Sequence, residues 1–96
     1  MNRAVITKPD RAGILQDVST LLADHMGVAP TTAIDEETRF FADLGLASID
    51  AVVLSEAIQA HYGRPLPFND LMAEIGRRTE RDLSIGELVG FLDEHL

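Results

Sequence analysis

The fold of this chain is decided by the stretch FFADLGLASIDAVVLSEAI, residues 40–58, where an apolar loop turns into an apolar helix. Apolar residues after the turn recur at helical spacing, and Gly63 and Pro65 end the pattern. A helix is therefore predicted from about Ser48 to Tyr62. The serine at its first position has acids close by and no histidine near it in sequence.

The predicted helix over 48–62 has two apolar sides. At about 100° per residue, one side holds the core-facing residues Leu54, Ile58 and Tyr62. The opposite side holds Ile49, Val52, Val53 and Ala60. A surface helix needs only one apolar stripe, so the second side has two interpretations. Either the long loop and the third helix bury it, or it forms an exposed docking patch beside Ser48.

A first helix is predicted in PDRAGILQDVSTLLADHMG, with Asp10 as its N-cap and Gly27 as its C′ residue. The connection that follows, residues 28–47, is long for so small a domain, which indicates a function or some structure of its own. Its apolar residues are expected to pack across the core. Its middle allows a short helical turn near 36–41.

Two more helices are predicted after Gly63. The third is short, near residues 69–76, with Asn69 as its candidate N-cap. The fourth lies in SIGELVGFLDEHL and opens with Ser84 and Glu87 at capping-box spacing. No stretch alternates as a strand does. The predicted fold is all-α: a small four-helix bundle with three main helices, a short third helix and a long loop between helices one and two.

Composition limits the function classes. The chain has 96 residues, enough for one small domain, with a flexible leader expected over 1–9 and the folded domain over 10–96. It has no cysteine, which excludes a disulfide scaffold and thiolate metal sites. Its formal net charge of −8 opposes binding to nucleic acid and anionic membranes and favours partners with basic patches. With no signal peptide and no apolar run near the roughly 20 residues of a membrane span, a cytoplasmic monomer is expected.

The residues around Ser48 favour a chemical role over capping alone. A serine at a helix start commonly caps backbone N–H groups. Here Gly45 allows a tight turn just before it, and Leu44 and Leu46 can anchor that turn to the core. Such a turn presents Ser48 on a fixed corner that faces solvent. A helix N-terminus also favours an attached anion, so a phosphate ester on this serine is electrostatically well placed.

The same stretch resembles the prosthetic-group site of acyl carrier proteins and peptidyl carrier proteins. The family pattern is Asp-Leu-Gly, two variable residues, the modified serine and an aliphatic residue, which correspond here to Asp43, Leu44, Gly45, Ser48 and Ile49. The order of the predicted elements matches the family as well, so the resemblance covers about residues 11–95. It implies the four-helix fold and a carrier that performs no catalysis of its own.

The resemblance implies a covalent 4′-phosphopantetheine cofactor on Ser48, moved there from coenzyme A by a phosphopantetheinyl transferase that holds its own magnesium. The thiol of this arm then carries acyl or aminoacyl groups as thioesters between loading enzymes, ketosynthases and other cargo-processing enzymes. No metal site and no catalytic residue is expected in the chain itself. The stretches RPLPFNDL and DLSIGELVGFL, without flanking linkers, favour a stand-alone carrier in polyketide, fatty acid or related specialised biosynthesis. Short or polar cargo is expected to stay outside the helices.

The chain departs from the family at two positions near the serine. Many members have an aspartate immediately before it, where this chain has Ala47, and a glutamate where this chain has Val53. Partner docking is therefore expected to depend on apolar contacts with acids around them. The expected docking residues are Asp43, Leu46, Ile49, Asp50, Val52, Val53 and Glu56.

Two charged clusters have more than one interpretation. The acids Asp35, Glu36 and Glu37 either steer a partner toward the long loop or belong to a solvated loop. The cluster GRR, together with Arg81, either balances local acids or contacts an acidic partner or the phosphate of an arm.

Two other function classes share parts of this pattern. A non-covalent helical interaction module has the same fold and uses the two-sided helix without modification. An enzyme with Ser48 as nucleophile needs a base, and the stretch GLASI lacks the glycine two places after the serine that a G-x-S-x-G motif requires. The histidines His25, His61 and His95 are scattered over three helices, which disfavours a catalytic triad and a zinc site.

Overall fold

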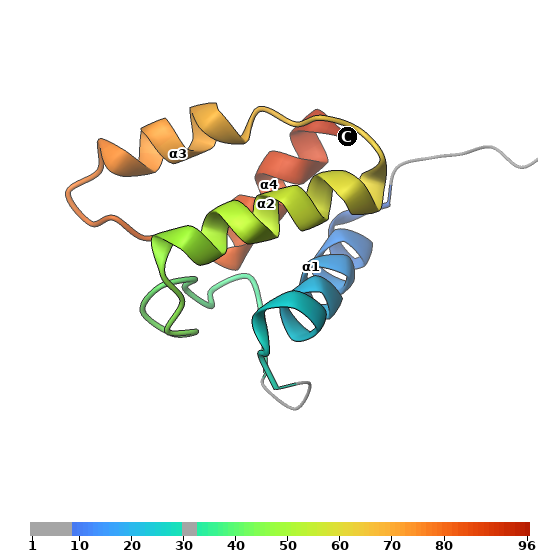
Figure 1. Ribbon diagram of the computed structural model, residues 1–96, viewed down its shortest axis with the longest axis horizontal. Helices are drawn as coiled ribbons and strands as arrows, with labels where there is room; N and C mark the ends of the chain where they lie inside the picture. The colour runs from blue at the N-terminus through green and yellow to red at the C-terminus, as the bar shows by residue number, and fades with distance from the viewer. Residues whose placement is uncertain (1–8, 30–32) are drawn as a thin grey trace, which may run out of the picture.

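The computed structural model describes residues 9–29 and 33–96. Within these residues the chain forms four helices, α1 (Arg11–Met26), α2 (Ser48–Tyr62), α3 (Phe68–Gly76) and α4 (Ile85–His95), as Figure 1 shows. The predicted all-α bundle with a short third helix and a long loop is confirmed. None of the helices in the described residues is long and apolar enough to cross a membrane. Residues 1–8 of the expected leader lie outside the described residues, so the leader stays a prediction.

Helix α1 begins and ends where its caps predict. The Asp10 carboxylate accepts a hydrogen bond from the Gly13 N–H at 2.8 Å, which satisfies one of the free donors of the first turn. Gly27 ends the helix with φ of 70°, a left-handed conformation that side chains with a Cβ rarely adopt. The buried face of α1 consists of Ile14, Val18, Leu21 and Leu22.

The core lies where α1 meets both α2 and α4. In Figure 1, α1 and α3 lie to opposite sides of α2. The largest fully buried side chains are Phe40, Ile14, Leu22, Ile58, Ile85, Leu88, Leu92, Val18 and Val89, and no polar or charged residue of the described part is buried. Polar contacts of Asp17 join α1 to α2 at the edge of this core. The Tyr62 hydroxyl donates to the Asp17 carboxylate at 2.8 Å, and burial together with this bond raises the pKa of Tyr62 well above its usual range.

Helix α3 begins one residue before the predicted cap. Its first residue is Phe68 and its N-cap is Pro67, which makes no side-chain hydrogen bond, so the prediction of Asn69 as N-cap is wrong. The reason is packing: the Phe68 side chain is buried in the core, and Asn69 points to solvent within the first turn. The approach to α3 is held instead by Gln59, whose side-chain oxygen accepts from the Leu66 N–H at 2.8 Å.

The long loop contains turns and no helix over 36–41. Asp35 Oδ1 accepts hydrogen bonds from the backbone N–H groups of residues 37 and 38, and the Thr38 N–H also donates to the Asp35 carbonyl at 3.2 Å, which closes a single turn. A helix-like turn follows, where the Asp43 N–H donates to the Arg39 carbonyl at 3.1 Å. The expected span near 36–41 therefore contains parts of two single turns and no regular helix.

The loop is held against the start of α4 by backbone hydrogen bonds. The Phe40 N–H donates to the Leu83 carbonyl at 2.8 Å, and the Ile85 N–H donates to the Thr38 carbonyl at 2.8 Å. The Gly86 N–H donates to the Glu36 carbonyl of the loop at 2.8 Å. The bonds from Ile85 and Gly86 use N–H donors of the first turn of α4 that no helical carbonyl can satisfy. The loop and the start of α4 therefore form one continuous support.

Asp82 ties the same two segments together from the side. Its carboxylate accepts from the N–H groups of Phe41 at 3.0 Å and Ala42 at 3.1 Å, and from that of Leu83 at 2.8 Å. Burial acts to raise the pKa of Asp82, but these backbone donors and the nearby Arg39 charge outweigh it, so the pKa lies below its usual value. The carboxylate therefore holds the loop mainly in its ionised form.

Candidate functional site

The turn before Ser48 is anchored as its sequence predicts. Gly45 has φ of 68°, the left-handed conformation that glycine adopts at little cost. Leu44 and Leu46 on either side of it are half-buried and pack against the core. The Leu46 N–H donates to the carbonyl of the buried Phe40 at 3.4 Å, so the turn is joined to the core by its backbone as well.

Ser48 does not cap the helix that it begins. The N-cap is Ala47, which has no side-chain oxygen, and Ser48 is the first helical residue. Asp50 closes the helix start instead, since its carboxylate accepts from the Ala47 N–H at 2.8 Å. The Ser48 side chain is exposed, and within the described residues it has no hydrogen-bond partner. Its hydroxyl is therefore free for a reaction with another molecule.

The second apolar side of α2 is exposed. Ile49 has 66% of its surface accessible to solvent, Val52 50% and Val53 39%, and these are the exposed large hydrophobic residues of the described part. The interpretation in which the loop and α3 bury this side is therefore wrong. We call these three residues the apolar patch. Their i, i+3 and i+4 spacing makes the three residues neighbours on the surface of α2, next to Ser48.

The other expected docking residues surround the apolar patch with different exposure. Asp43 and Glu56 are exposed, whereas Asp50 and Leu46 are half-buried. Asp43 also has a local role, because its carboxylate accepts from the Arg39 N–H at 2.8 Å. The Arg39 side chain also lies 3.7 Å from the Asp43 carboxylate. Of these acids, Glu56 is therefore exposed without a partner in the described residues, and Asp43 is exposed but paired with Arg39.

The acids of the long loop hold the fold together rather than standing free. Glu36 forms an ion pair with Arg11 at 2.6 Å, and the same guanidinium donates to the Gly86 carbonyl at 3.2 Å. Asp35 closes the turn described above. Only Glu37 of the three is left as an exposed side chain without a partner among the described residues. Of the three acids, only Glu37 is therefore left to steer a partner toward the loop.

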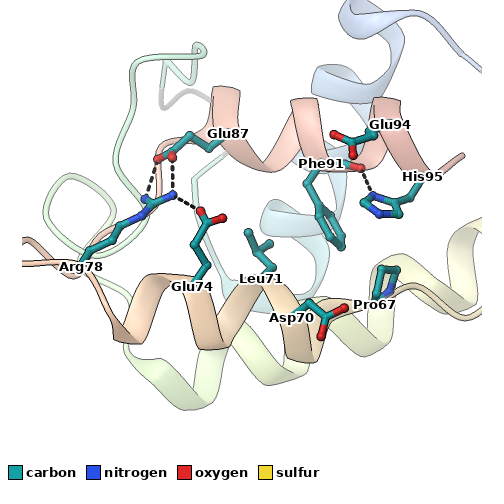
Figure 2. Close-up of a pocket in the computed structure, with 9 residues that line it drawn as sticks. All are labelled: Pro67, Asp70, Leu71, Glu74, Arg78, Glu87, Phe91, Glu94 and His95. Carbon is teal, nitrogen blue, oxygen red and sulfur yellow. Dashed lines mark hydrogen bonds and ion pairs between the residues drawn. The ribbon is translucent and has the colours of Figure 1, made fainter.

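The arginines near α3 differ in their partners. Arg78 contacts the carboxylates of Glu74 at 2.7 Å and Glu87 at 2.6 Å, as Figure 2 shows. This pairing is the main reason why the pKa of Glu87 lies below its usual value. Arg77 and Arg81 are exposed and have no carboxylate partner within the described part of the chain. Arg78 thus balances local acids, and Arg81 remains available.

A groove of about 460 Å³ opens directly beside Ser48. It is lined by Phe41, Ser48, Val52, Met72, Ile75, Gly76 and Arg81. The sequence pattern did not place Met72 and Ile75 next to the serine. The helical spacing of the apolar residues Phe68, Leu71 and Ile75 in α3 was the available signal, but it does not show which neighbour this apolar face meets.

Two other hollows differ from this groove. The groove in Figure 2, of about 360 Å³, lies between α3 and α4 and shares no lining residue with the one at Ser48. The space inside the core between Phe40, Leu54 and Phe68 is about 10 Å³, close to the minimum for a single water molecule. This space therefore has no room for an acyl chain in this conformation.

The described residues show neither a triad nor a metal centre. No group of three or more histidine, cysteine, aspartate or glutamate residues in this part of the chain could hold a metal ion. His61 lies 3.6 Å from the Asp17 carboxylate, and His95 lies 2.9 Å from the Phe91 carbonyl oxygen. No base is hydrogen-bonded to Ser48, so this geometry gives no support to a serine hydrolase.

Comparison with known proteins agrees with this geometry. Residues 16–92 match the family model described as phosphopantetheine attachment site. The acyl carrier protein of Zymomonas mobilis subsp. mobilis is 28% identical over 78 residues, which cover 81% of this chain and 88% of the relative. The acyl carrier protein of Clostridium acetobutylicum is 27% identical over 82 residues, which cover 85% and 95%. Since the family match spans most of the chain and includes Ser48, the chain belongs to the phosphopantetheine attachment site family of carrier proteins, whose prosthetic group is covalent 4′-phosphopantetheine.

Proposed function

We propose that Ser48 is the attachment site of 4′-phosphopantetheine and that the protein is a non-catalytic acyl carrier, a substrate of the enzymes that it serves. The observation that carries this proposal is the exposed Ser48 hydroxyl, which has no partner in the described residues and stands on an anchored corner. A serine that served only the fold would be expected to cap its helix, as Ser84 does at α4.

The residues at the corner fit the prosthetic group. In the transfer, a bond forms between Ser48 Oγ and the phosphorus of the phosphopantetheine unit of coenzyme A. The bond from that phosphorus to the adenosine bisphosphate breaks, and the hydroxyl proton leaves to a base of the transferase. The product is a phosphodiester anion at the first residue of α2, where the free N–H groups and the dipole of the helix favour negative charge.

The arm supplies a terminal thiol that holds cargo as a thioester, and the chain itself has no cysteine to compete for that cargo. The protein's own part is to present the arm. The turn over residues 43–47 fixes where the arm begins, because Gly45 shapes it and the half-buried Leu44 and Leu46 hold it to the core. A tethered intermediate then visits successive enzymes at a high effective concentration.

The apolar patch is the proposed docking surface for the transferase and the cargo-processing enzymes. Its residues Ile49, Val52 and Val53 are exposed beside Ser48, with Asp43 and Glu56 open to solvent around them. Leu46 and Asp50 contribute mainly by shaping the helix start. A partner with an apolar pocket and a basic rim complements this surface, because the chain carries a net charge of −8.

We propose that short or polar cargo stays outside the helices and that the protein acts in polyketide, fatty acid or related specialised biosynthesis. Support for external cargo comes from the internal space of about 10 Å³, since opening the packed core loses contacts between its side chains. Loading assays on the holo protein test the pathway. Whether malonyl, medium-chain acyl or aminoacyl loading enzymes transfer their groups to the arm distinguishes the carrier classes.

The attachment is tested by intact-mass measurement after incubation with coenzyme A and a broad-range phosphopantetheinyl transferase. Wild-type protein is expected to gain the mass of one phosphopantetheine unit, and Ser48→Ala none. Ser84→Ala is the matched control, because it removes a serine from another helix start, and it is expected to be modified. No gain on the wild type, or an equal gain on Ser48→Ala, contradicts the proposal. An unmodified protein that co-purifies with one partner supports the non-covalent interaction module instead.

A further inference from the structure

The groove beside Ser48 has one charged residue in an apolar lining. The side chains of Phe41, Val52, Met72 and Ile75 form its apolar part, and Arg81 is the charged residue among the described residues that line it. Asp43 and Asp50 are close to Ser48 in sequence but do not line the groove. The charge inside the groove is therefore positive, although the protein as a whole is acidic.

Arg81 has no carboxylate partner within the described residues, unlike Arg78, which is held by Glu74 and Glu87. Of the two acids next to Arg81 in sequence, Asp82 accepts three backbone N–H groups and Glu80 forms no ion pair in the described part of the chain. Within the described residues no carboxylate lies within ion-pair distance of Arg81. A guanidinium presents several donors in a fixed plane that suits two oxygens of a phosphate. An exposed guanidinium with no partner in an otherwise apolar groove is thus suited to an anion.

We propose that Arg81 is a positioning residue for the arm, through contact between its guanidinium and the phosphodiester on Ser48. This inference rests on the proposed attachment at Ser48, which places a permanent anion at the edge of the groove. The ion pair directs the first part of the arm along the groove toward α3. The branched aliphatic part of the arm next to the phosphate then meets Val52, Met72 and Ile75.

The direction of the arm affects what a partner enzyme meets. Val52 belongs both to the groove and to the apolar patch, whereas Ile49 and Val53 line the patch alone. An arm held in the groove covers part of Val52 and leaves the other two residues open for docking. Because the ion pair is exposed, salt weakens it and a docking partner can release the arm.

The test compares apo and holo wild-type protein by NMR, after intact mass has established conversion. The Arg81 Nε–Hε signal is expected to shift on conversion, and that of Arg77 to stay in place. Arg77 is the matched control because it is an exposed, unpaired arginine outside the groove. Added salt is expected to return the Arg81 signal toward its apo position. A mass gain with an unmoved Arg81 signal overturns the role of Arg81 and leaves the attachment intact, whereas no mass gain overturns both.

Variants add a second readout on the arm itself. In holo Arg81→Ala, the phosphorus signal and the signals of the arm's methyl groups are expected to sharpen and to move toward those of the urea-unfolded holo protein, which carries the same phosphodiester. In holo Arg77→Ala they are expected to match the wild type. Equal arm signals in wild type and Arg81→Ala contradict the proposal. If Arg81→Ala is a poor transferase substrate, the role of Arg81 is still tested by the apo and holo spectra of the wild-type protein, because that comparison needs no variant.

Discussion

Two helices of this protein start at serines, and the two serines are used in opposite ways. Ser84 is the N-cap of α4: its hydroxyl accepts from the Glu87 N–H at 3.0 Å, and the Glu87 carboxylate accepts from the Ser84 N–H at 3.1 Å. Ser48 is the first residue of α2, and its hydroxyl has no partner within the described residues. At α2 the capping contact runs between Asp50 and the Ala47 backbone, which leaves the serine free.

The two starts are also physically connected. The loop that leads to Ser48 hydrogen-bonds to Leu83, Ile85 and Gly86 at the start of α4, with Asp82 bridging the two segments. The start of α4 is thus the support on which the reactive corner stands. The difference teaches that stability and reactivity are assigned to different serines in this fold: Ser84 stabilises the start of α4, and that start supports the corner on which Ser48 is left free.

The largest effect on stability is expected from Gly86→Ala. A Cβ at this position would lie 2.7 Å from the Glu36 carbonyl oxygen, so the loop must move away from α4. We expect a loss of about 1–3 kcal/mol in the free energy of unfolding, measured by urea denaturation. Gly76→Ala is the control, because nothing lies within 4 Å of its added Cβ, and it should be neutral or slightly stabilising. Equal stability of the two variants contradicts the supporting role of this contact.

The next effect concerns function alone. Ile49→Ala removes the most exposed residue of the apolar patch, 66% accessible, and should leave stability within about 0.5 kcal/mol of the wild type. We expect kcat/KM for phosphopantetheinyl transfer to fall several-fold, up to about tenfold, which corresponds to about 1.4 kcal/mol. Gln16→Ala, an exposed and uncharged change on α1, should leave the rate unchanged. An unaltered rate for Ile49→Ala removes this residue from the docking surface.

The serines themselves give the direct comparison. Ser84→Ala removes an N-cap and one half of a capping box, so we expect a loss of about 1 kcal/mol in the free energy of unfolding. Ser48→Ala removes a hydroxyl without a partner in the described residues and should change stability by less than about 0.5 kcal/mol. Thermal or urea unfolding of the two variants measures both effects. A larger loss for Ser48→Ala than for Ser84→Ala reverses the assignment of the two roles.

The smallest effect is expected on acidification. The pKa values of Asp82 and Glu87 lie below their ordinary values of 3.8 and 4.5, so their contribution to stability is fully present above those values. It is lost as the pH falls through the lowered pKa values of the folded protein. Both carboxylates contact solvent, so each contributes less than about 1 kcal/mol. The free energy of unfolding, measured from pH 6 down to about pH 2.5, should fall less steeply for Asp82→Asn than for the wild type. Parallel plots of this free energy against pH for the two proteins contradict the prediction.

The sequence predicted the helices well and the loop poorly. The bounds of α1 and α2 and the capping box of α4 depend on residues a few positions apart, so they were visible in the sequence. The cap of α3 was wrong because burial of Phe68, and not a local hydrogen bond, sets its start. The helical turn allowed near 36–41 forms as two separate single turns, one closed around Asp35 and one that starts at Arg39.

The sequence by itself determined the family motif around Ser48, the four helices and the glycine turn before the serine, because short-range spacing and backbone preferences specify all three. Only the tertiary structure decided that the second side of α2 is exposed, that Arg78 is paired while Arg81 lines a groove, and that α4 supports the loop. These properties depend on which distant segments meet. Periodicity assigns residues to a face of a helix, but it does not tell whether another element, or solvent, covers that face.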